Sequence, residues 1–264
     1  MNASHATTRA DLRAEGERVR RALFGDDAQA PLATAAAGFD ALMAELAYGS
    51  IWTRPGLARP ERMACTLAAL VAVQGWDALP AHVGAALDLG LPPNAIVEII
   101  VQDGIYRGFA AAEAGLKLAL AVFAARGLAV APADADATTL DELTQLGRGV
   151  QSALHGARKD EGHAAPGHPV TGTIYPTVVQ QCYGTIWHRP GLDRRWRALC
   201  AVAAFAALGR DGLLRKFALS ARNVGATRTE VIEAVVQTGP YSGFAFMLNG
   251  LSQVAAAFGE SAPA

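Results

Sequence analysis

A ten-residue string near the start of the chain occurs a second time, 135 positions later. Residues 48–57 read YGSIWTRPGL, and residues 183–192 read YGTIWHRPGL. The same spacing holds without a gap for about 70 positions, of which about a third are identical. Repeats of this kind indicate duplicated structural units. The 264 residues are therefore predicted to form two homologous modules, residues 1–130 and residues 131–264, rather than one large domain.

The register of the repeat changes before this string. A weaker match joins residues 16–25 to residues 147–156, four positions out of register with the main repeat. The second module is therefore predicted to carry a short insertion, most easily placed in the Gly-, Pro- and His-rich residues 162–172. The join between the modules is predicted near residues 127–139, where Ala-, Pro- and Asp-rich sequence breaks the hydrophobic periodicity.

Hydrophobic periodicity predicts that both modules are all-α. In the first module, apolar residues recur at helical spacing over residues 9–24, 34–47, 61–74, 79–89, 93–103 and 108–125. Pro55 and Gly56 break the chain between the second and third segments, because Pro fixes φ and Gly tolerates the angles of a sharp turn. In the second module, Thr227 and Glu230 have the spacing of a capping box at a helix start.

Charge and cysteine content argue against several classes of protein. The chain carries 23 Lys and Arg against 24 Asp and Glu, so nothing in its charge favours nucleic acid or an anionic membrane as partner. The first 21 residues lack the apolar run of a signal peptide, and the most apolar stretch, residues 198–208, is too short to span a bilayer. Three cysteines without a CxxC pair fit a reducing cytoplasm, where we expect the protein.

A polar ladder runs along an otherwise apolar helix in each module. Its members are four positions apart, so they share one helix face. They are Glu98, Gln102 and Tyr106 in the first module and Glu233, Gln237 and Tyr241 in the second. Each carboxylate could tie down a neighbouring Arg or backbone group, or the ladder could form the polar wall of a pocket. Because both modules keep it, the structural interpretation is favoured.

Two arginines flank the Arg-Pro-Gly turn of each module. They are Arg54 and Arg62 in the first module and Arg189 and Arg197 in the second. Guanidinium groups suit bidentate recognition of a carboxylate, so one interpretation is that they bind an anionic ligand. The other is that they form salt bridges with Glu98 and Glu233, which needs no ligand. The sequence leaves both interpretations open.

Only one of the six histidines, His82, falls within a predicted core helix. Its counterpart in the second module is Phe217, so the modules differ at this position. A lone helical histidine is more often packed or exposed than catalytic. Four other histidines fall in predicted tail or linker segments, namely His5, His155, His163 and His168. Nothing spaces them as metal ligands, so no metal site is predicted.

These residues together resemble the carboxymuconolactone decarboxylase family. The matching string is Ile-Trp-x-Arg-Pro-Gly-Leu-x4-Arg over residues 51–62, followed by His82, Gly90, Glu98 and Tyr106-x-Gly108. The resemblance covers most of each module and implies a duplicated, all-helical bundle of the alkylhydroperoxidase-D type. Single-module members are similar in forming hexameric rings, so a chain with two modules is expected to form a homotrimer that holds six.

The family's founding activity implies cofactor-free decarboxylation or rearrangement of a small carboxylated lactone or oxo-acid in aromatic catabolism. On this resemblance, His82 delivers a proton to the carbanion left by CO2, and Arg62 and Glu98 complete the catalytic set. The substrate-binding residues implied are Trp52, Arg54, Tyr106, Trp187, Arg189, Arg197 and Tyr241. Phe217, in place of the family histidine, implies one competent site per chain.

Two other functions stay open at this stage. One branch of the family reduces peroxidised partners through a CxxC pair shortly before the histidine, but residues 75–81 contain no cysteine. A peroxiredoxin-like antioxidant protein would have to use Cys65 or Cys200, which lie on an apolar helix where the thiolate is disfavoured. The other alternative is a non-catalytic module that binds a ligand or serves assembly.

Overall fold

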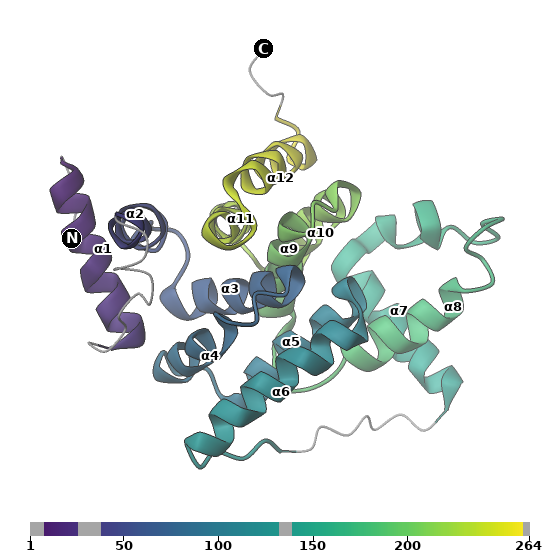
Figure 1. Ribbon diagram of the computed structural model, residues 1–264. Helices are drawn as coiled ribbons and strands as arrows, with labels where there is room; N and C mark the ends of the chain where they lie inside the picture. The colour runs from purple at the N-terminus through teal and green to yellow at the C-terminus, as the bar shows by residue number, and fades with distance from the viewer. Residues whose placement is uncertain (1–7, 26–37, 132–138, 261–264) are drawn as a thin grey trace.

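The computed structural model describes residues 8–25, 38–131 and 139–260. Within these residues every regular element is a helix, which confirms the predicted all-α fold. Figure 1 shows α3 and α9 meeting at the centre, with the other helices arranged around them. None of the described helices is both long and apolar enough to cross a membrane.

The two modules repeat one order of helices. The first contains α1 (Arg9–Phe24), α2 (Phe39–Met43), α3 (Arg59–Val73), α4 (Leu79–Asp88), α5 (Pro93–Arg107) and α6 (Phe109–Ala125). The second contains α7 (Leu140–His155), α8 (Tyr175–Thr177), α9 (Arg194–Ala207), α10 (Asp211–Asn223), α11 (Arg228–Ser242) and α12 (Phe244–Ala257). Two π-helices, η1 (Ala44–Gly49) and η4 (Val178–Ile186), precede the Arg-Pro-Gly turns, and two 3-10 turns, η2 (Gly156–Asp160) and η3 (Gly162–Ala164), follow α7. The capping box predicted at the start of α11 is present.

The helix predicted over residues 34–47 changes type in its last four residues. Its first four residues lie outside the described part of the chain, α2 covers Phe39–Met43, and a π-helix follows. The N–H of Trp52 donates to the carbonyl of Ala47, five residues back, at 3.1 Å. The equivalent bond recurs after η4. A short apolar pattern does not distinguish this wider turn from an α-helix, so the sequence did not reveal it.

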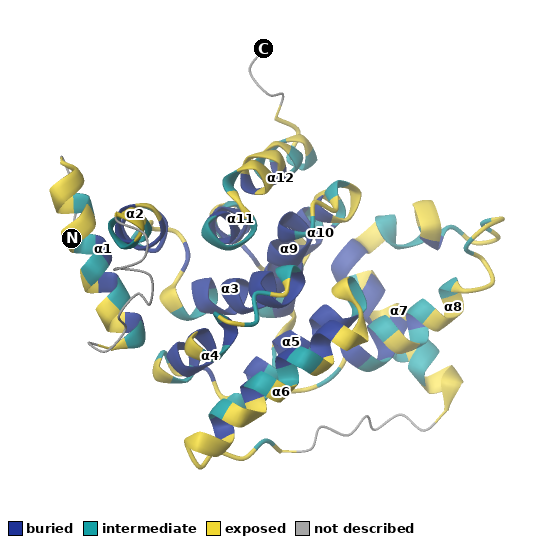
Figure 2. Cartoon of the chain, viewed as in Figure 1, coloured by how far each residue is buried: buried dark blue, intermediate teal, exposed yellow. Residues whose placement is uncertain are grey.

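The cores of the two modules interlock. The cluster built mainly from the second module also contains Ile51, Leu57 and Cys65 of the first, and the cluster built mainly from the first contains Cys200 of the second. Helices α3 and α9 are buried along most of their length (Figure 2). They are therefore the shared centre of both cores rather than the surface of either module.

Small side chains allow this central contact. A third cluster joins the C-terminal halves of α3 and α9 and consists of Ala69, Ala72, Ala204 and Ala207. Alanine keeps the helix backbones close and costs no side-chain entropy on burial. The Ala-rich composition of the two segments thus determines how near the modules approach.

A glycine on α7 allows another close contact. A Cβ atom on Gly147 would lie 2.2 Å from the carbonyl oxygen of Val179 in η4. Gly16 of α1 makes the equivalent contact, since a Cβ there would lie 1.9 Å from the carbonyl oxygen of Ala44. Any side chain at these positions would push the N-terminal helix of the module away from the π-helix that carries its aromatic residues.

Replacing Gly147 with Ala is expected to destabilise the protein by about 2 to 3 kcal/mol, because the methyl group has no space. Gly149 is the matched control on the same helix, since a Cβ there meets nothing within 4 Å. Gly149→Ala should stabilise the protein by about 0.5 to 1 kcal/mol through helix propensity. Urea unfolding measures both. Equal effects of the two substitutions would contradict the close contact.

Candidate functional site

The arginines of the first module's turn bind a glutamate of the second module. Arg54 donates from Nε and Nη2 to the Glu233 carboxylate at 2.6–3.1 Å, and Arg62 donates from Nη2 at 2.8 Å. Arg62 also donates to the Gln237 amide oxygen at 3.1 Å. Burial favours a higher pKa of Glu233, but the hydrogen bonds from the two arginines outweigh it, so the pKa is lowered.

The reciprocal set joins the second module's turn to the first module. Arg189 donates from Nε and Nη2 to the Glu98 carboxylate at 2.9–3.0 Å, and Arg197 donates from Nη2 at 2.8 Å. Arg197 also donates to the Gln102 amide oxygen at 3.3 Å, and Gln102 donates back to the Arg197 carbonyl at 2.8 Å. Of the two interpretations of the arginines, the structure therefore shows salt bridges, and each set crosses between modules. We call the two sets the crossed clamps.

The crossed clamps hold the helices α11 and α5 so that a tyrosine of each module packs against a ring of the other module. Tyr241 lies two helical turns after Glu233 on α11, and its ring lies against that of His82 in the first module, with centroids 5.4 Å apart. Trp52 Nε1 donates to the Tyr241 hydroxyl at 2.9 Å. On the other side, the ring of Tyr106 lies 4.5 Å from that of Phe205 in α9. The candidate sites are therefore composite.

His82 is buried on α4 with one ring nitrogen unpaired. Its Nδ1 lies 2.8 Å from the carbonyl oxygen of Ala78, so this nitrogen carries the proton. Its Nε2 is buried without a hydrogen-bond partner among the described residues. Burial lowers the pKa of His82 below its usual value, which keeps the free ring neutral. No described hydrogen bond joins His82 to Arg62 or Glu98.

Each module has one contact between a histidine ring and a phenylalanine ring, but the two residues lie on opposite helices in the two modules. In the first module His82 of α4 packs edge-on against Phe24 of α1, with ring centroids 5.0 Å apart. In the second module Phe217 of α10 packs edge-on against His155 of α7, at 5.3 Å. The expectation that His155 lies in a linker is wrong, because it is the last residue of α7 and is buried. The second module therefore keeps an imidazole at this contact, on the opposite helix.

The His155 ring is fully hydrogen-bonded, in contrast to His82. Ser220 donates its hydroxyl proton to the Lys216 carbonyl at 2.8 Å, so its oxygen accepts from His155 Nδ1 at 2.7 Å. His155 Nε2 then accepts from the Tyr183 hydroxyl at 3.0 Å. Burial, together with the positive charges of Lys216 and Arg158, lowers the pKa of His155 to about 3. The imidazole is therefore neutral and fixed in one tautomer.

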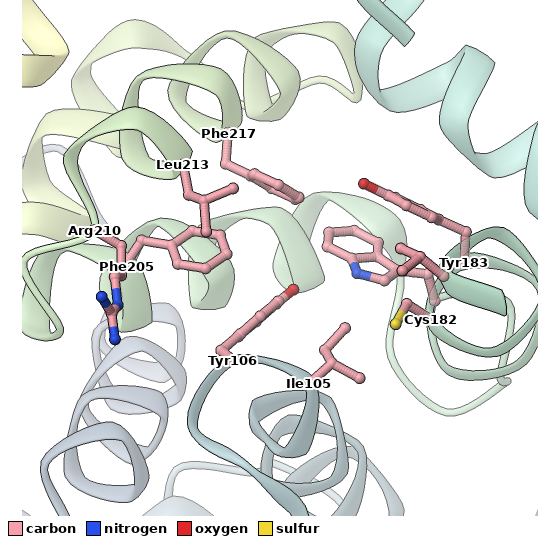
Figure 3. Close-up of a pocket in the computed structure, with 10 residues that line it drawn as sticks. Ile105, Tyr106, Cys182, Tyr183, Phe205, Arg210, Leu213 and Phe217 are labelled. Carbon is pink, nitrogen blue, oxygen red and sulfur yellow. The ribbon is translucent and has the colours of Figure 1, made fainter. Parts of the chain in front are cut away.

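A cavity lies beside this contact in the second module. Its volume is about 180 Å3, and it is lined by residues of α5, η4, α9 and α10. In Figure 3 the hydroxyls of Tyr106 and Tyr183 point toward a group of aromatic rings that includes Phe205 and Phe217. Trp187 also lines the cavity, whereas the predicted residues Arg189 and Arg197 do not.

Cysteine chemistry finds no support in the geometry. Cys65 and Cys200 are free and buried, and burial raises the pKa of the Cys65 thiol to about 12 and that of the Cys200 thiol well above its usual value. Cys182 lines the cavity, and burial raises its pKa as well. Thiols with raised pKa values are poor nucleophiles at neutral pH. Among the described residues, no three His, Cys, Asp or Glu side chains are placed to hold a metal ion.

Sequence reasoning passed over Asp103, which is buried beside the ladder on α5. Neither of its carboxylate oxygens has a hydrogen-bond partner among the described residues, and burial raises its pKa well above the usual value. Its counterpart, Thr238, is satisfied by the carbonyl of Val235 at 2.8 Å. The difference from Thr238 was readable in the repeat, but its burial was not.

Removing Arg62 is expected to cost about 3 to 5 kcal/mol of stability, because Glu233 would keep a buried charge with one partner fewer. Arg54 is the matched control, since its side chain is 43% exposed and that of Arg62 is 1% exposed. Arg54→Ala should cost about 1 kcal/mol or less. Denaturant unfolding of the two variants measures the difference, and equal small losses would contradict a buried clamp.

His155 is expected to make the protein labile in acid. Its folded pKa of about 3 lies below the unfolded value of about 6.5, so its contribution is complete above pH 6.5 and is lost as the pH falls toward 3. Between about pH 6 and pH 4, His155→Phe should lower the slope of unfolding free energy by about 1.4 kcal/mol per pH unit. Tyr183→Phe keeps the imidazole and should keep the slope. An unchanged slope in His155→Phe would contradict the buried neutral ring.

Comparison with known proteins gives the same picture of duplication. The sequence profile of the carboxymuconolactone decarboxylase family matches two segments, residues 37–121 and 174–256. A 4-carboxymuconolactone decarboxylase of Acinetobacter baylyi is 33% identical over 91 residues, which are 34% of this chain and 68% of that protein. A nitrosuccinic acid decarboxylase of Metarhizium robertsii is 33% identical over 67 residues, 25% of this chain and about half (47%) of that protein. The chain therefore belongs to the carboxymuconolactone decarboxylase family, whose profile it matches twice in tandem.

Proposed function

We propose that the protein decarboxylates or rearranges a small carboxylated lactone or oxo-acid, with His82 as the proton-transferring group. The observation that carries this proposal is the buried, unpartnered Nε2 of His82 in a chain of this family. The names of both relatives describe decarboxylation of a small carboxylic acid. A polar atom left unpaired in an apolar site is costly, so a role in handling a proton explains its retention.

The proposed step needs only one proton from the protein. Loss of CO2 leaves the electrons of the broken C–C bond on the substrate carbon, as an enolate or a related carbanion. The protonated Nε2 of His82 then donates its proton to that carbon, and the ring returns to its neutral form. Solvent supplies the proton for the next cycle.

Substrate charge would provide the protonated ring. Burial keeps free His82 neutral, which is unsuitable for donating a proton. A substrate carboxylate beside Nε2 would favour the imidazolium and raise the pKa on binding. The bond from Nδ1 to Ala78 holds the ring so that Nε2 is the nitrogen that changes protonation.

Some of the other predicted residues lie beside His82, and others act only by holding a helix of the site in place. Trp52 and Tyr241 lie beside His82 and are proposed to form the wall against the substrate. Arg62 acts as a positioning residue, because it holds Glu233 on the helix that carries Tyr241. Glu98 has the same role for Tyr106, which lies on the same helix, α5, and lines the cavity of the second module.

His82→Gln is expected to lower kcat for CO2 release from 4-carboxymuconolactone by about 100-fold or more, because the amide has no titrating nitrogen. The exposed His188, in the equivalent turn of the second module, is the control, and His188→Gln should keep the activity. Circular dichroism confirms that both variants are folded. Full activity in folded His82→Gln would refute the proposed role.

A further inference from the structure

The cavity of the second module has no part in the proposed chemistry at His82. By the 135-residue repeat, its residues Tyr106, Trp187 and Phe217 are equivalent to Tyr241, Trp52 and His82. The cavity is thus the second module's counterpart of the His82 site, with a phenyl ring in place of the imidazole. Any hydrogen bond to a ligand in this cavity must therefore come from its other polar groups.

One of these groups is an unpaired hydroxyl. The Tyr106 hydroxyl is buried and forms no hydrogen bond of good geometry among the described residues, whereas the equivalent Tyr241 hydroxyl accepts from Trp52 at 2.9 Å. Trp187, the counterpart of Trp52, acts on the Tyr106 oxygen only as a donor, so the Tyr106 proton itself has no acceptor. Burial raises the pKa of Tyr106 well above the usual value, so the hydroxyl keeps its proton. In Figure 3 it points into the cavity. It is therefore a donor that a bound oxygen atom would satisfy.

The second group is the Tyr183 hydroxyl, which already donates its proton in a hydrogen bond. Tyr183 lines the cavity and donates its proton to His155, whose ring is held by Ser220, so the Tyr183 oxygen can act toward a ligand only as an acceptor. The Tyr183 hydroxyl also interacts with Tyr175 and Gln151, neither of which lines this cavity. Tyr106 and Tyr183 together offer one donor and one acceptor among aromatic rings.

An outer cavity adjoins the inner one, and its lining residues all belong to the second module. It has a volume of about 620 Å3 and shares five lining residues with the inner cavity, among them Tyr183, Arg210 and Phe217. Gly162, His163 and Ala164 of η3 also line it. Part of the segment predicted to hold the insertion therefore forms the wall of an approach to the inner cavity.

We propose that the inner cavity of the second module binds a small planar phenol. A ring hydroxyl both accepts from Tyr106 and donates to Tyr183, and the ring itself stacks among Trp187, Phe205 and Phe217. The size is suitable, because an apolar cavity of about 150 Å3 in another protein holds benzene. The site binds without transferring a proton, since no imidazole of the described residues lines the inner cavity: that of His155 lies behind Tyr183, and that of His163 lines the outer cavity.

The test uses phenol, toluene and anisole as probes of the full chain. Indole N–H signals in 1H–15N spectra report the location, with Trp187 in the cavity and Trp52 beside His82; Trp→Phe variants assign them. Phenol should shift the Trp187 signal and leave that of Trp52 in place. Phenol should also bind more tightly than toluene, which has the same shape, and than anisole, which cannot donate.

Two substitutions separate the roles of the hydroxyls. Tyr106→Phe should weaken phenol binding about 5- to 10-fold and leave toluene binding unchanged, as expected for one lost hydrogen bond. His155→Phe frees the Tyr183 proton to point at the ligand, so the preference for phenol over anisole should shrink. If His155 served only the stability of the fold, His155→Phe would leave the ratio of phenol affinity to anisole affinity unchanged.

His82→Gln leaves the inner cavity unchanged and should bind phenol as the unaltered chain does. Phenol binding therefore tests this proposal even if the proposed decarboxylation at His82 is wrong. The proposal is overturned if the Trp187 signal does not respond to phenol or if Trp52 responds instead. It is also overturned if Tyr106→Phe weakens toluene as much as phenol.

Discussion

The crossed clamps are the interaction on which the rest of the structure depends. Each places two guanidinium groups of one module on a single buried carboxylate of the other. The planar, multidentate guanidinium satisfies both carboxylate oxygens and nearby carbonyl groups at once, which an ammonium group does not do. Because removal of a buried partner such as Arg62 or Glu233 leaves a buried charge without its full set of partners, the clamps oppose separation of the modules. They also determine which helix of one module lies against which site of the other.

This arrangement makes each candidate site a product of both modules. Tyr241 reaches His82 because α11 is held through Glu233, and Tyr106 reaches the second cavity because α5 is held through Glu98. The two sites differ most clearly in where the imidazole lies. In the first, the imidazole nitrogen is unpaired; in the second, the imidazole lies behind a tyrosine that bonds to it. One architecture thus supports a proton-transfer site and a binding site.

Much of the fold could be predicted from the sequence because helix signals and the repeat are local. The predicted ends of α1 and α4 agree with the structure to within one residue. The pairing of arginines with glutamates was one of two open interpretations, but its crossing between modules was not predicted. An internal repeat shows which positions are equivalent and does not show whether equivalent groups pair within a module or between modules.

The second histidine was missed although its signal was present. The out-of-register match of residues 16–25 with 147–156 pairs Phe24 with His155, and Val150 and Leu154 precede it at helical spacing. Reading His155 as a linker residue ignored that helix. The unpaired atoms of His82, Tyr106 and Asp103 are a different case, because an unsatisfied group is defined by all its neighbours in space. No spacing along the chain encodes that.

The central claim, that buried ion pairs between modules hold the molecule together, is tested most directly by a double-mutant cycle on Arg62 and Glu233. The unaltered chain, Arg62→Ala, Glu233→Ala and the double variant are unfolded in urea under identical conditions. A direct buried pair predicts a coupling energy of about 2 kcal/mol or more. Effects that add to within about 0.5 kcal/mol would show that the two residues act independently and would contradict the clamp.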